Sequence, residues 1–171
     1  MKITLAFGLA LIASCVAPRG PTASEDSETR QAAADALTAF VDAWNQAATG
    51  DPQAPTAYGM LYWPDAELVD PSGRIWHDQP AIVQMHVDLW NTGFKASVVK
   101  GTVRRTRRLS PTLMIADFDL ELALFGQAPS GGSVTNGVVR THLKHVMEKR
   151  SGTWKVVAAQ NTFYSGSLPA R

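Results

Sequence analysis

The sequence predicts an α+β protein, with a curved antiparallel sheet that carries helices on one face. Two observations indicate this class. In the first half of the chain apolar residues recur at helical spacing, whereas from Ala96 onward they recur at every second position, as in strands. Early helices followed by a long antiparallel run are typical of α+β domains. The 171 residues suffice for one domain with its own core.

The first helix is expected to start near Ser24 or Ser27, with acidic residues at the positive end of its dipole. Gly50-Asp51-Pro52 ends it. The apolar residues between these points fall on one helical face, which predicts a buried stripe: Leu37, Phe40, Val41, Trp44 and Ala48.

The middle of the chain predicts short elements and then a longer helix. A third helix is expected over Gln79–Asn91, because Pro80 suits a first turn. His86 shares the apolar face of that helix, so it should point at the core or at a pocket. The shorter elements expected before it are a helical piece over Pro55–Tyr62, a strand over Ala66–Val69, a turn at Pro71-Ser72-Gly73 and a return strand over Arg74–Trp76.

Four long strands are expected to form two hairpins. The first hairpin turns at Ser110-Pro111 and the second at Ser151-Gly152, and a loop over Gly126–Gly132 joins them. The expected strands are Ala96–Leu109, Thr112–Phe125, Val134–Lys149 and Thr153–Phe163.

Charge pairing predicts the register of the first hairpin. The predicted partners are Lys100 with Glu121, Thr102 with Asp119, and Arg104 with Asp117. We interpret the three acidic residues as a charge ladder on an outer face in preference to a metal or acid/base cluster. Alternation divides the basic run 104–108 between two faces, which argues against a nucleic-acid site.

In the second hairpin the same reasoning pairs Glu148 with Lys155. The other face then carries Thr141, Leu143, His145 and Met147 opposite Thr162, Gln160, Ala158 and Val156. That mixture of large apolar groups and a few polar ones is typical of a pocket lining, and equally of an inner face with one satisfied histidine.

Composition excludes several function classes. A net charge of +1 with 18% charged residues argues against a general nucleic-acid binder. The single cysteine excludes an internal disulfide. His142 and His145 would face opposite sides of a strand, and no nucleophile elbow or phosphate loop is present, so we expect no metal and no cofactor.

The N-terminus resembles a bacterial export signal. Met1-Lys2 precedes an uncharged run, Ile3–Ala13, that is too short to span a bilayer. Ile12-Ala13-Ser14-Cys15 is similar to a lipobox, in which lipidated Cys15 anchors the mature chain at a membrane surface. Ordinary cleavage that discards Cys15 is the alternative. We expect a signal peptide over 1–14, a tether over 15–26, the domain over 27–165 and a tail over 166–171, in a periplasmic or cell-surface lipoprotein or otherwise a secreted protein.

Two histidines are the candidates for acid/base catalysis, His145 on the sheet and His86 on the third helix, since an imidazole transfers protons near neutral pH. The candidate substrate contacts are Gln160, Tyr58, Trp44 and Asp65. Gln160 shares the His145 face in the predicted register, and Tyr58, Tyr62 and Asp65 are expected near a pocket mouth. A tryptophan such as Trp44 more often anchors a core.

The order of elements resembles the nuclear-transport-factor-two-like superfamily, and within it SnoaL-like proteins of the SgcJ/EcaC type. The matching residues are Trp44-Asn45, Gly50-Asp51, Tyr62-Trp63-Pro64-Asp65-Ala66, Gly73, Ile82, His86, Gly152, Trp154-Lys155-Val156 and Ala159-Gln160-Asn161-Thr162. Asp78 and a longer segment over Gln53–Met60 depart from the pattern.

This resemblance implies a cone-shaped pocket between helices and sheet, and a homodimer. It does not imply one reaction, because the fold serves isomerases, dehydratases, cyclases and non-catalytic binders. Two hypotheses follow: a protein that binds a small hydrophobic molecule and carries out cofactor-free acid/base chemistry on it, or a non-catalytic ligand-binding or dimeric interaction module. Small apolar residues of the last strand, Val157 and Ala159, are expected on a covered outer face.

Overall fold

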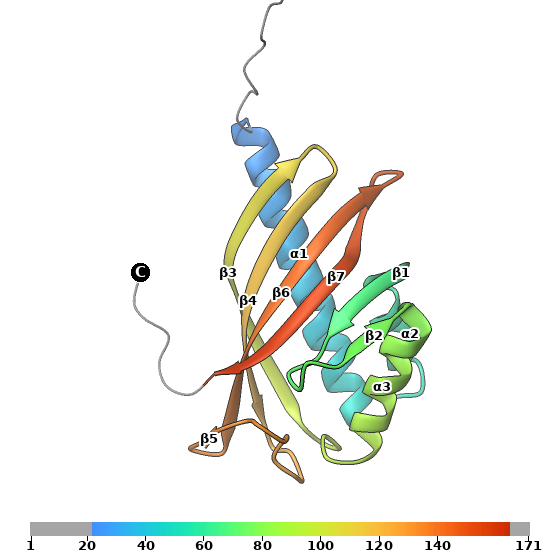
Figure 1. Cartoon of the computed structure of the whole chain (residues 1–171), viewed down its shortest axis with the longest axis vertical. Helices are drawn as coiled ribbons and strands as arrows, with labels where there is room; N and C mark the ends of the chain where they lie inside the picture. Colours follow the sequence, from blue (N-terminus) through green and yellow to red (C-terminus); the bar gives the residue numbers. More distant parts are fainter. Residues whose placement is uncertain (1–21, 165–171) are drawn as a thin grey trace, which may run out of the picture.

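The computed structural model describes residues 22–164 (Figure 1). The predicted signal peptide, Cys15, most of the predicted tether and the predicted tail lie outside these residues. The fold is α+β, as predicted: one long helix and two shorter ones pack against a curved, open sheet of seven strands. No helix in the described part of the chain is long and apolar enough to cross a membrane.

Helix α1 spans Ala23–Ala48 and begins earlier than predicted. Its N-cap is Thr22, whose hydroxyl accepts a hydrogen bond from the Glu25 amide, while the Glu25 carboxylate accepts one from the Thr22 amide. This reciprocal capping box makes Thr22 the N-cap, rather than the predicted Ser24 or Ser27. The last residues of the predicted tether are therefore helical.

The next elements are α2 (Ala54–Gly59), β1 (Tyr62–Val69), β2 (Ile75–His77) and α3 (Gln79–Asn91). The predicted bounds of α3 are confirmed. Strand β1 starts four residues before its predicted start, because Tyr62 already pairs with Val156 of the last strand. That pairing is parallel, and the other pairs of neighbouring strands in the sheet are antiparallel.

The remaining strands are β3 (Val98–Ser110), β4 (Leu113–Ala123), β5 (Val134–Thr135), β6 (Val138–Arg150) and β7 (Thr153–Tyr164), in the spatial order β2-β1-β7-β6-β4-β3 with β5 beside β6. The strand predicted over Val134–Lys149 is interrupted at Asn136-Gly137. Both residues have positive φ, of 53° and 74°, which suits the tight turn between β5 and β6.

The register of the first hairpin is confirmed at one end and wrong at the other. Lys100 faces Glu121 and Thr102 faces Asp119, as predicted. A bulge then places Arg105, not Arg104, opposite Asp117, and a second bulge moves the turn to Pro111-Thr112. Each bulge adds one residue to β3. The turn lies one residue later than predicted, and the two added residues restore the predicted pairing of Lys100 and Thr102.

The second hairpin contains a bulge with larger consequences. Glu148 faces Lys155, as predicted, but beyond Met147 an extra residue on β7 shifts the register by one. His145 consequently faces Ala159, and Leu143 faces Asn161. Ala159 is buried at 6% exposure, so its predicted position on the outer face is wrong.

The outer face of β4 and β6, opposite α1, carries the predicted charge ladder. Asp117 pairs with Lys144, Glu121 pairs with Arg140, and Asp119 accepts hydrogen bonds from Arg104 and His142. This confirms the charge-ladder interpretation of the three carboxylates.

The carboxylate of Glu28, near the start of α1, connects this helix to strands β3, β6 and β7. Glu28 accepts hydrogen bonds from Lys149 (2.5 Å), Arg108 (3.1 Å) and Trp154 (3.2 Å). These donors, Lys149 foremost, lower the pKa of Glu28 to about 2. Arg108 points to α1 while Arg104 points to the outer face, so the basic run is divided between two faces. Simple alternation would place these two residues on one face, and the bulge at Arg104 separates them.

Candidate functional site

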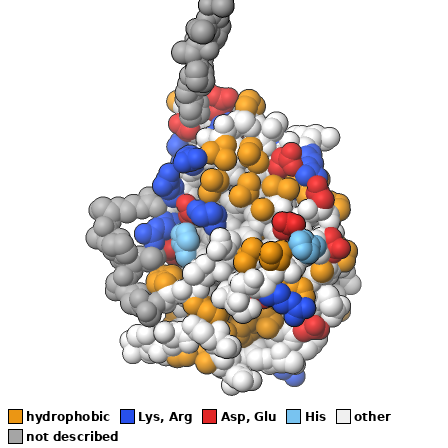
Figure 2. Space-filling view, in the orientation of Figure 1, with side chains coloured by type: hydrophobic (Ala, Val, Ile, Leu, Met, Phe, Trp, Pro, Cys, Tyr) orange, Lys and Arg blue, Asp and Glu red, His pale blue; other side chains and the backbone are white. Residues whose placement is uncertain are grey.

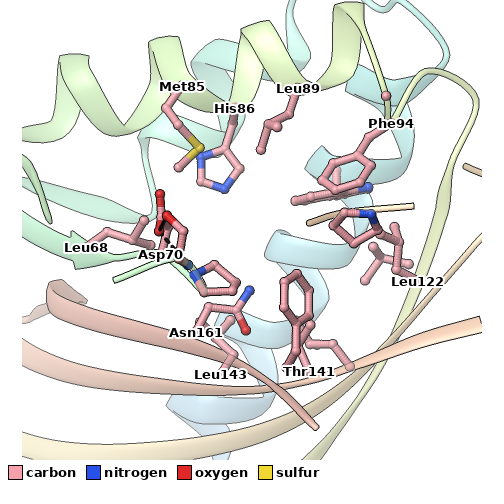
Figure 3. A pocket seen from close by; sticks show the side chains of 18 of the residues that line it. Leu68, Asp70, Met85, His86, Leu89, Phe94, Leu122, Thr141, Leu143 and Asn161 are labelled. Carbon is pink, nitrogen blue, oxygen red and sulfur yellow. Dashed lines mark hydrogen bonds between the residues drawn. The ribbon is translucent and has the colours of Figure 1, made fainter. Parts of the chain in front are cut away.

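A cavity of about 440 Å³ lies between the C-terminal half of α1, helix α3 and the inner face of the sheet (Figure 3). Ligand pockets in proteins commonly measure about 300–1,000 Å³. Most of the wall is apolar, with Phe40, Trp44, Leu68, Trp76, Met85, Leu89, Phe94, Val99, Leu120, Leu122, Leu143 and Phe163. The polar groups are few and include Tyr58, Tyr62, Asp70, His86, Thr141 and Asn161.

His86 reaches this cavity from α3, as its helical face predicted. Its Nδ1 lies 2.8 Å from the carbonyl oxygen of Ile82, and its Nε2 lies 2.9 Å from the hydroxyl of Tyr58. The Tyr58 hydroxyl in turn lies 3.1 Å from the hydroxyl of Tyr62. Three buried polar side chains therefore form one continuous hydrogen-bonded chain.

The direction of the protons in this chain follows from burial. Burial lowers the pKa of His86 to about 4, although the Ile82 carbonyl and the charge of Asp70 oppose this, so the ring is neutral at pH 7. Nδ1 must donate to the carbonyl, which leaves Nε2 to accept from Tyr58. Tyr58 then accepts from Tyr62. Burial also raises the pKa of Tyr62 to about 12 and holds that of Tyr58 well above its ordinary value, so both phenols stay protonated.

Asp70 lines the cavity at the end of β1, beside Met85 and His86 (Figure 3). Its Oδ1 accepts from the Ser72 amide (2.8 Å), the Ser72 hydroxyl (2.5 Å) and the Arg74 amide (3.1 Å), and its Oδ2 accepts from the indole of Trp76 (3.0 Å). Burial raises the pKa of Asp70, but these donors together outweigh it, and the net shift is downward. The site thus contains an ionised carboxylate.

Asn161 occupies the place that the sequence predicted for Gln160. The bulge in β7 turns Asn161 into the cavity beside Leu143 and leaves Gln160 exposed, opposite Lys144 (Figure 3). Gln160 therefore does not line the cavity, contrary to its predicted direction. The amide oxygen of Asn161 is buried and has no hydrogen-bond partner among residues 22–164.

His145, the other predicted catalytic residue, does not line the cavity. It is buried at 2% exposure, and its ring packs against Phe118, Tyr62 and Phe40 at centroid distances of 5.2, 6.3 and 6.4 Å. Neither ring nitrogen has a partner in the described part of the chain, and burial lowers its pKa to about 3. The two histidines do not open into one cavity, because His145 lies within the aromatic core.

Of the other predicted substrate contacts, Trp44 and Tyr58 line the cavity and Asp65 does not. Trp44 lines the cavity, and its indole donates to the Ser97 hydroxyl at 3.0 Å. Tyr58 lines it too, but as a fully buried residue rather than at a mouth. Asp65 lies outside, where it is exposed and forms a bidentate ion pair with Arg150 at 2.8 and 3.0 Å, so its predicted place at the mouth is wrong. Over residues 22–164, no three His, Cys, Asp or Glu side chains gather as a metal site.

Two site residues were missed by the sequence reasoning. Asp70 directly precedes Pro71-Ser72-Gly73, and an aspartate there is typical of a turn, whose amides it indeed caps. Asn161 is one residue from the predicted contact, and only knowledge of the β7 bulge distinguishes the two. For Asp70, the sequence offered one signal, which was its position between a predicted strand and a predicted turn.

Comparison with known proteins identifies the fold. No family model matches the sequence, and no curated protein is similar to it. Among solved structures, a protein with a cystatin-like fold from Caulobacter vibrioides matches with a TM-score of 0.68 and 23% identity, over 81% of this chain and 91% of that one. A putative scytalone dehydratase from Novosphingobium aromaticivorans matches at 0.68 and 10% identity, over 88% and 94%.

A ketosteroid isomerase-like protein from Erwinia carotovora atroseptica matches with a TM-score of 0.62 and 15% identity, over 85% of this chain and all of that one. At these identities the likeness is one of fold. The SgcJ/EcaC type stays a prediction. An NTF-2-like protein from Shewanella oneidensis matches with a TM-score of 0.60 and 14% identity, over 78% of this chain and 98% of that one. The helices, the sheet order and this neighbour agree that the chain has the nuclear-transport-factor-two-like fold.

Proposed function

We propose that this protein binds a small, largely apolar molecule in the cavity between α1, α3 and the sheet. The observation that carries the proposal is the cavity itself: about 440 Å³, with mostly aliphatic and aromatic walls and a few polar groups. Such a combination is typical of small-molecule sites, because apolar walls supply affinity and the polar groups fix orientation.

A pair of neighbouring substitutions tests the binding proposal. Asn161 faces the cavity and Gln160 faces away from it, so Asn161→Phe should fill the site while Gln160→Phe leaves it open. The probe is N-phenyl-1-naphthylamine, a neutral fluorophore that brightens in apolar surroundings. We expect the wild type and Gln160→Phe to bind it alike and Asn161→Phe to bind at least about tenfold more weakly. No binding by the wild type would refute the proposal.

A second candidate function is cofactor-free proton transfer on the bound molecule. Two observations favour it: an ionised carboxylate, Asp70, and a neutral imidazole, His86, border the same cavity, and the structural neighbours include proteins named for isomerase-like and dehydratase activities. Asp70 would accept a proton from one atom of the ligand and return it to another, while the oxygen of Tyr58, whose own proton is donated to His86, would accept a hydrogen bond from a donor group of the ligand.

The test of this candidate starts from the molecule that co-purifies with the protein, identified by native mass spectrometry. Turnover of that molecule should fall at least about a hundredfold in Asp70→Asn and in His86→Gln. Asp65→Asn, which removes the same charge outside the cavity, should leave turnover unchanged. Full turnover by both cavity variants would leave ligand binding as the function.

We further propose that the protein is exported and held at a membrane surface through a lipid on Cys15. The support is the uncharged run before Ile12-Ala13-Ser14-Cys15. Wild type should fractionate with membranes, and Cys15→Ser should not. A Cys15→Ser protein that still fractionates with membranes would refute the anchor.

The proposed homodimer uses the outer face of the sheet. Ile115, Val146 and Ala158 lie side by side across β4, β6 and β7 on that face, half-buried in the single chain. Figure 2 shows apolar side chains over its upper part, with Lys and Arg side chains beside them. Light scattering should give twice the monomer mass for wild type and for Val134→Asp on β5, and the monomer mass for Val146→Asp. A monomeric wild type would refute the dimer.

A further inference from the structure

The charges around the cavity are unbalanced. Among the described residues that line it, Asp70 is the one ionised side chain, and there is no lysine or arginine. His86 does not compensate, because its ring is neutral. Arg74, the basic residue nearest to Asp70 in the sequence, stacks on the ring of Trp76, with its guanidinium carbon 3.9 Å from the ring centroid, and is not part of the lining. An anionic ligand would therefore find one carboxylate and no cation.

Asp70 also retains acceptor capacity. Among the residues that the structure describes, three of the four donors to Asp70 converge on Oδ1, whereas Oδ2 accepts from the Trp76 indole alone. A carboxylate oxygen accepts about two hydrogen bonds, so Oδ2 has one site left. Figure 3 shows this carboxylate beside Met85 and His86 at one side of the cavity. Because the other donors come from its own turn, a ligand can bind Oδ2 without any rearrangement of that turn.

One wall beside this carboxylate is the indole of Trp76, and further aromatic side chains line other parts of the cavity. Trp76 contacts Asp70 directly, and Phe40, Trp44, Phe94 and Phe163 line the same cavity. Aromatic faces attract organic cations, and they bury the apolar body that carries the charge. An ionised carboxylate inside such walls is complementary to an ammonium group on a hydrophobic molecule.

We propose that the ligand of this cavity is a hydrophobic amine, whose ammonium group donates to Oδ2 of Asp70 while its apolar body packs among the aromatic and aliphatic walls. This inference rests on the proposed binding function and specifies the class of ligand. An anion is disfavoured by the same carboxylate. A neutral alcohol can make the hydrogen bond but lacks the charge, so it binds more weakly.

Three probes of one shape test the proposal: 1-naphthylmethylamine, 1-naphthalenemethanol and 1-naphthoic acid, which at pH 7 are cationic, neutral and anionic. Calorimetry with the wild-type protein should give an amine affinity at least about tenfold above that of the alcohol, since a hydrogen bond to a charged group adds roughly that much. The acid should show no binding. Asp70→Asn should bring amine and alcohol within about threefold, and Asp70→Glu, which keeps the charge, should retain a preference for the amine.

Asp65→Asn is the matched control, because it removes one carboxylate outside the cavity, on the strand that directly precedes Asp70. It should keep the full preference for the amine. An alcohol that binds as tightly as the amine in the wild type, or an acid that binds at all, overturns the amine proposal while the binding function stands. If none of these probes nor the neutral fluorophore binds, the proposed function itself fails. Because the wild-type series decides the question alone, a poorly folded Asp70→Asn protein does not obscure it.

Discussion

Replacing His145 by leucine should stabilise the protein. The wild-type ring is buried at 2% exposure, and both of its nitrogens lack partners within residues 22–164. An unpaired buried donor or acceptor costs about 1–3 kcal/mol. Leucine fills a similar volume, and refitting a core to a new shape usually costs less than about 1.5 kcal/mol. We therefore expect His145→Leu to raise the free energy of unfolding by about 1–2 kcal/mol near neutral pH.

The same substitution should make the free energy of unfolding depend less on pH in the acidic range. Burial lowers the pKa of His145 from 6.5 to about 3, so between these values the unfolded chain binds a proton that the folded chain does not. Stability must then fall as the pH falls through this window. From pH 7.5 to pH 5 the loss amounts to about 2 kcal/mol for His145. His86, with a pKa of about 4, adds a similar loss and remains in the variant.

Urea unfolding followed by tryptophan fluorescence, at several pH values between about 5 and 7.5, measures both effects. Gln160→Leu is the control, because Gln160 is exposed and carries no titratable group, so the acid dependence should stay unchanged. The reasoning is refuted if His145→Leu is no more stable than wild type near neutral pH and loses stability in acid as steeply. That result would mean that the imidazole is solvated or hydrogen-bonded in the folded protein.

Three further substitutions test the packing of the helices. Glu28→Gln should lower the melting temperature, and the difference from wild type should shrink as the pH falls from about 4.5 to about 2, where Glu28 itself becomes protonated. Asp35→Asn, an exposed change on the same helix, should have little effect. Tyr58→Phe should cost about 1–3 kcal/mol of unfolding free energy, since Nε2 of His86 loses its donor; equal stability would contradict the assigned chain. Gly101→Val should cost about 1–3 kcal/mol, because even a Cβ there would lie 2.7 Å from Leu37; a neutral outcome in chemical denaturation would show that α1 moves aside easily.

Local signals predicted much of the fold. The Pro80 start and the bounds of α3, and the turn at Ser151-Gly152, rest on propensities that act within a few residues, and they are confirmed. The Asn136-Gly137 turn was equally local, but the alternating residues on both sides concealed it. The start of β1 was not predictable, since it depends on pairing with Val156, almost a hundred residues away.

The site was harder to predict than the fold because one inserted residue in a strand moves every following side chain to the other face of the sheet. One extra residue in β7 exchanges Gln160 for Asn161 and turns Ala159 inward, although the pairing of Glu148 with Lys155 was predicted correctly. A bulge is a response to twist and packing across several strands, and it leaves no local sequence signature here. His145 was predicted on the correct face, yet Tyr62 and Phe118 enclose it, and sequence spacing does not reveal which inward residue reaches open space.

The length of α1 would keep the cavity away from the lipid that we propose on Cys15. The helix begins at Ala23, and its contributions to the cavity, Phe40 and Trp44, come in its second half, about 25–32 Å further along its axis at 1.5 Å per residue (Figure 1). A lipid on Cys15 would hold the opposite end of this rod. The binding chamber would then stand off from the bilayer, so its cargo would arrive from the surrounding fluid or from a soluble carrier rather than by lateral diffusion out of the lipid.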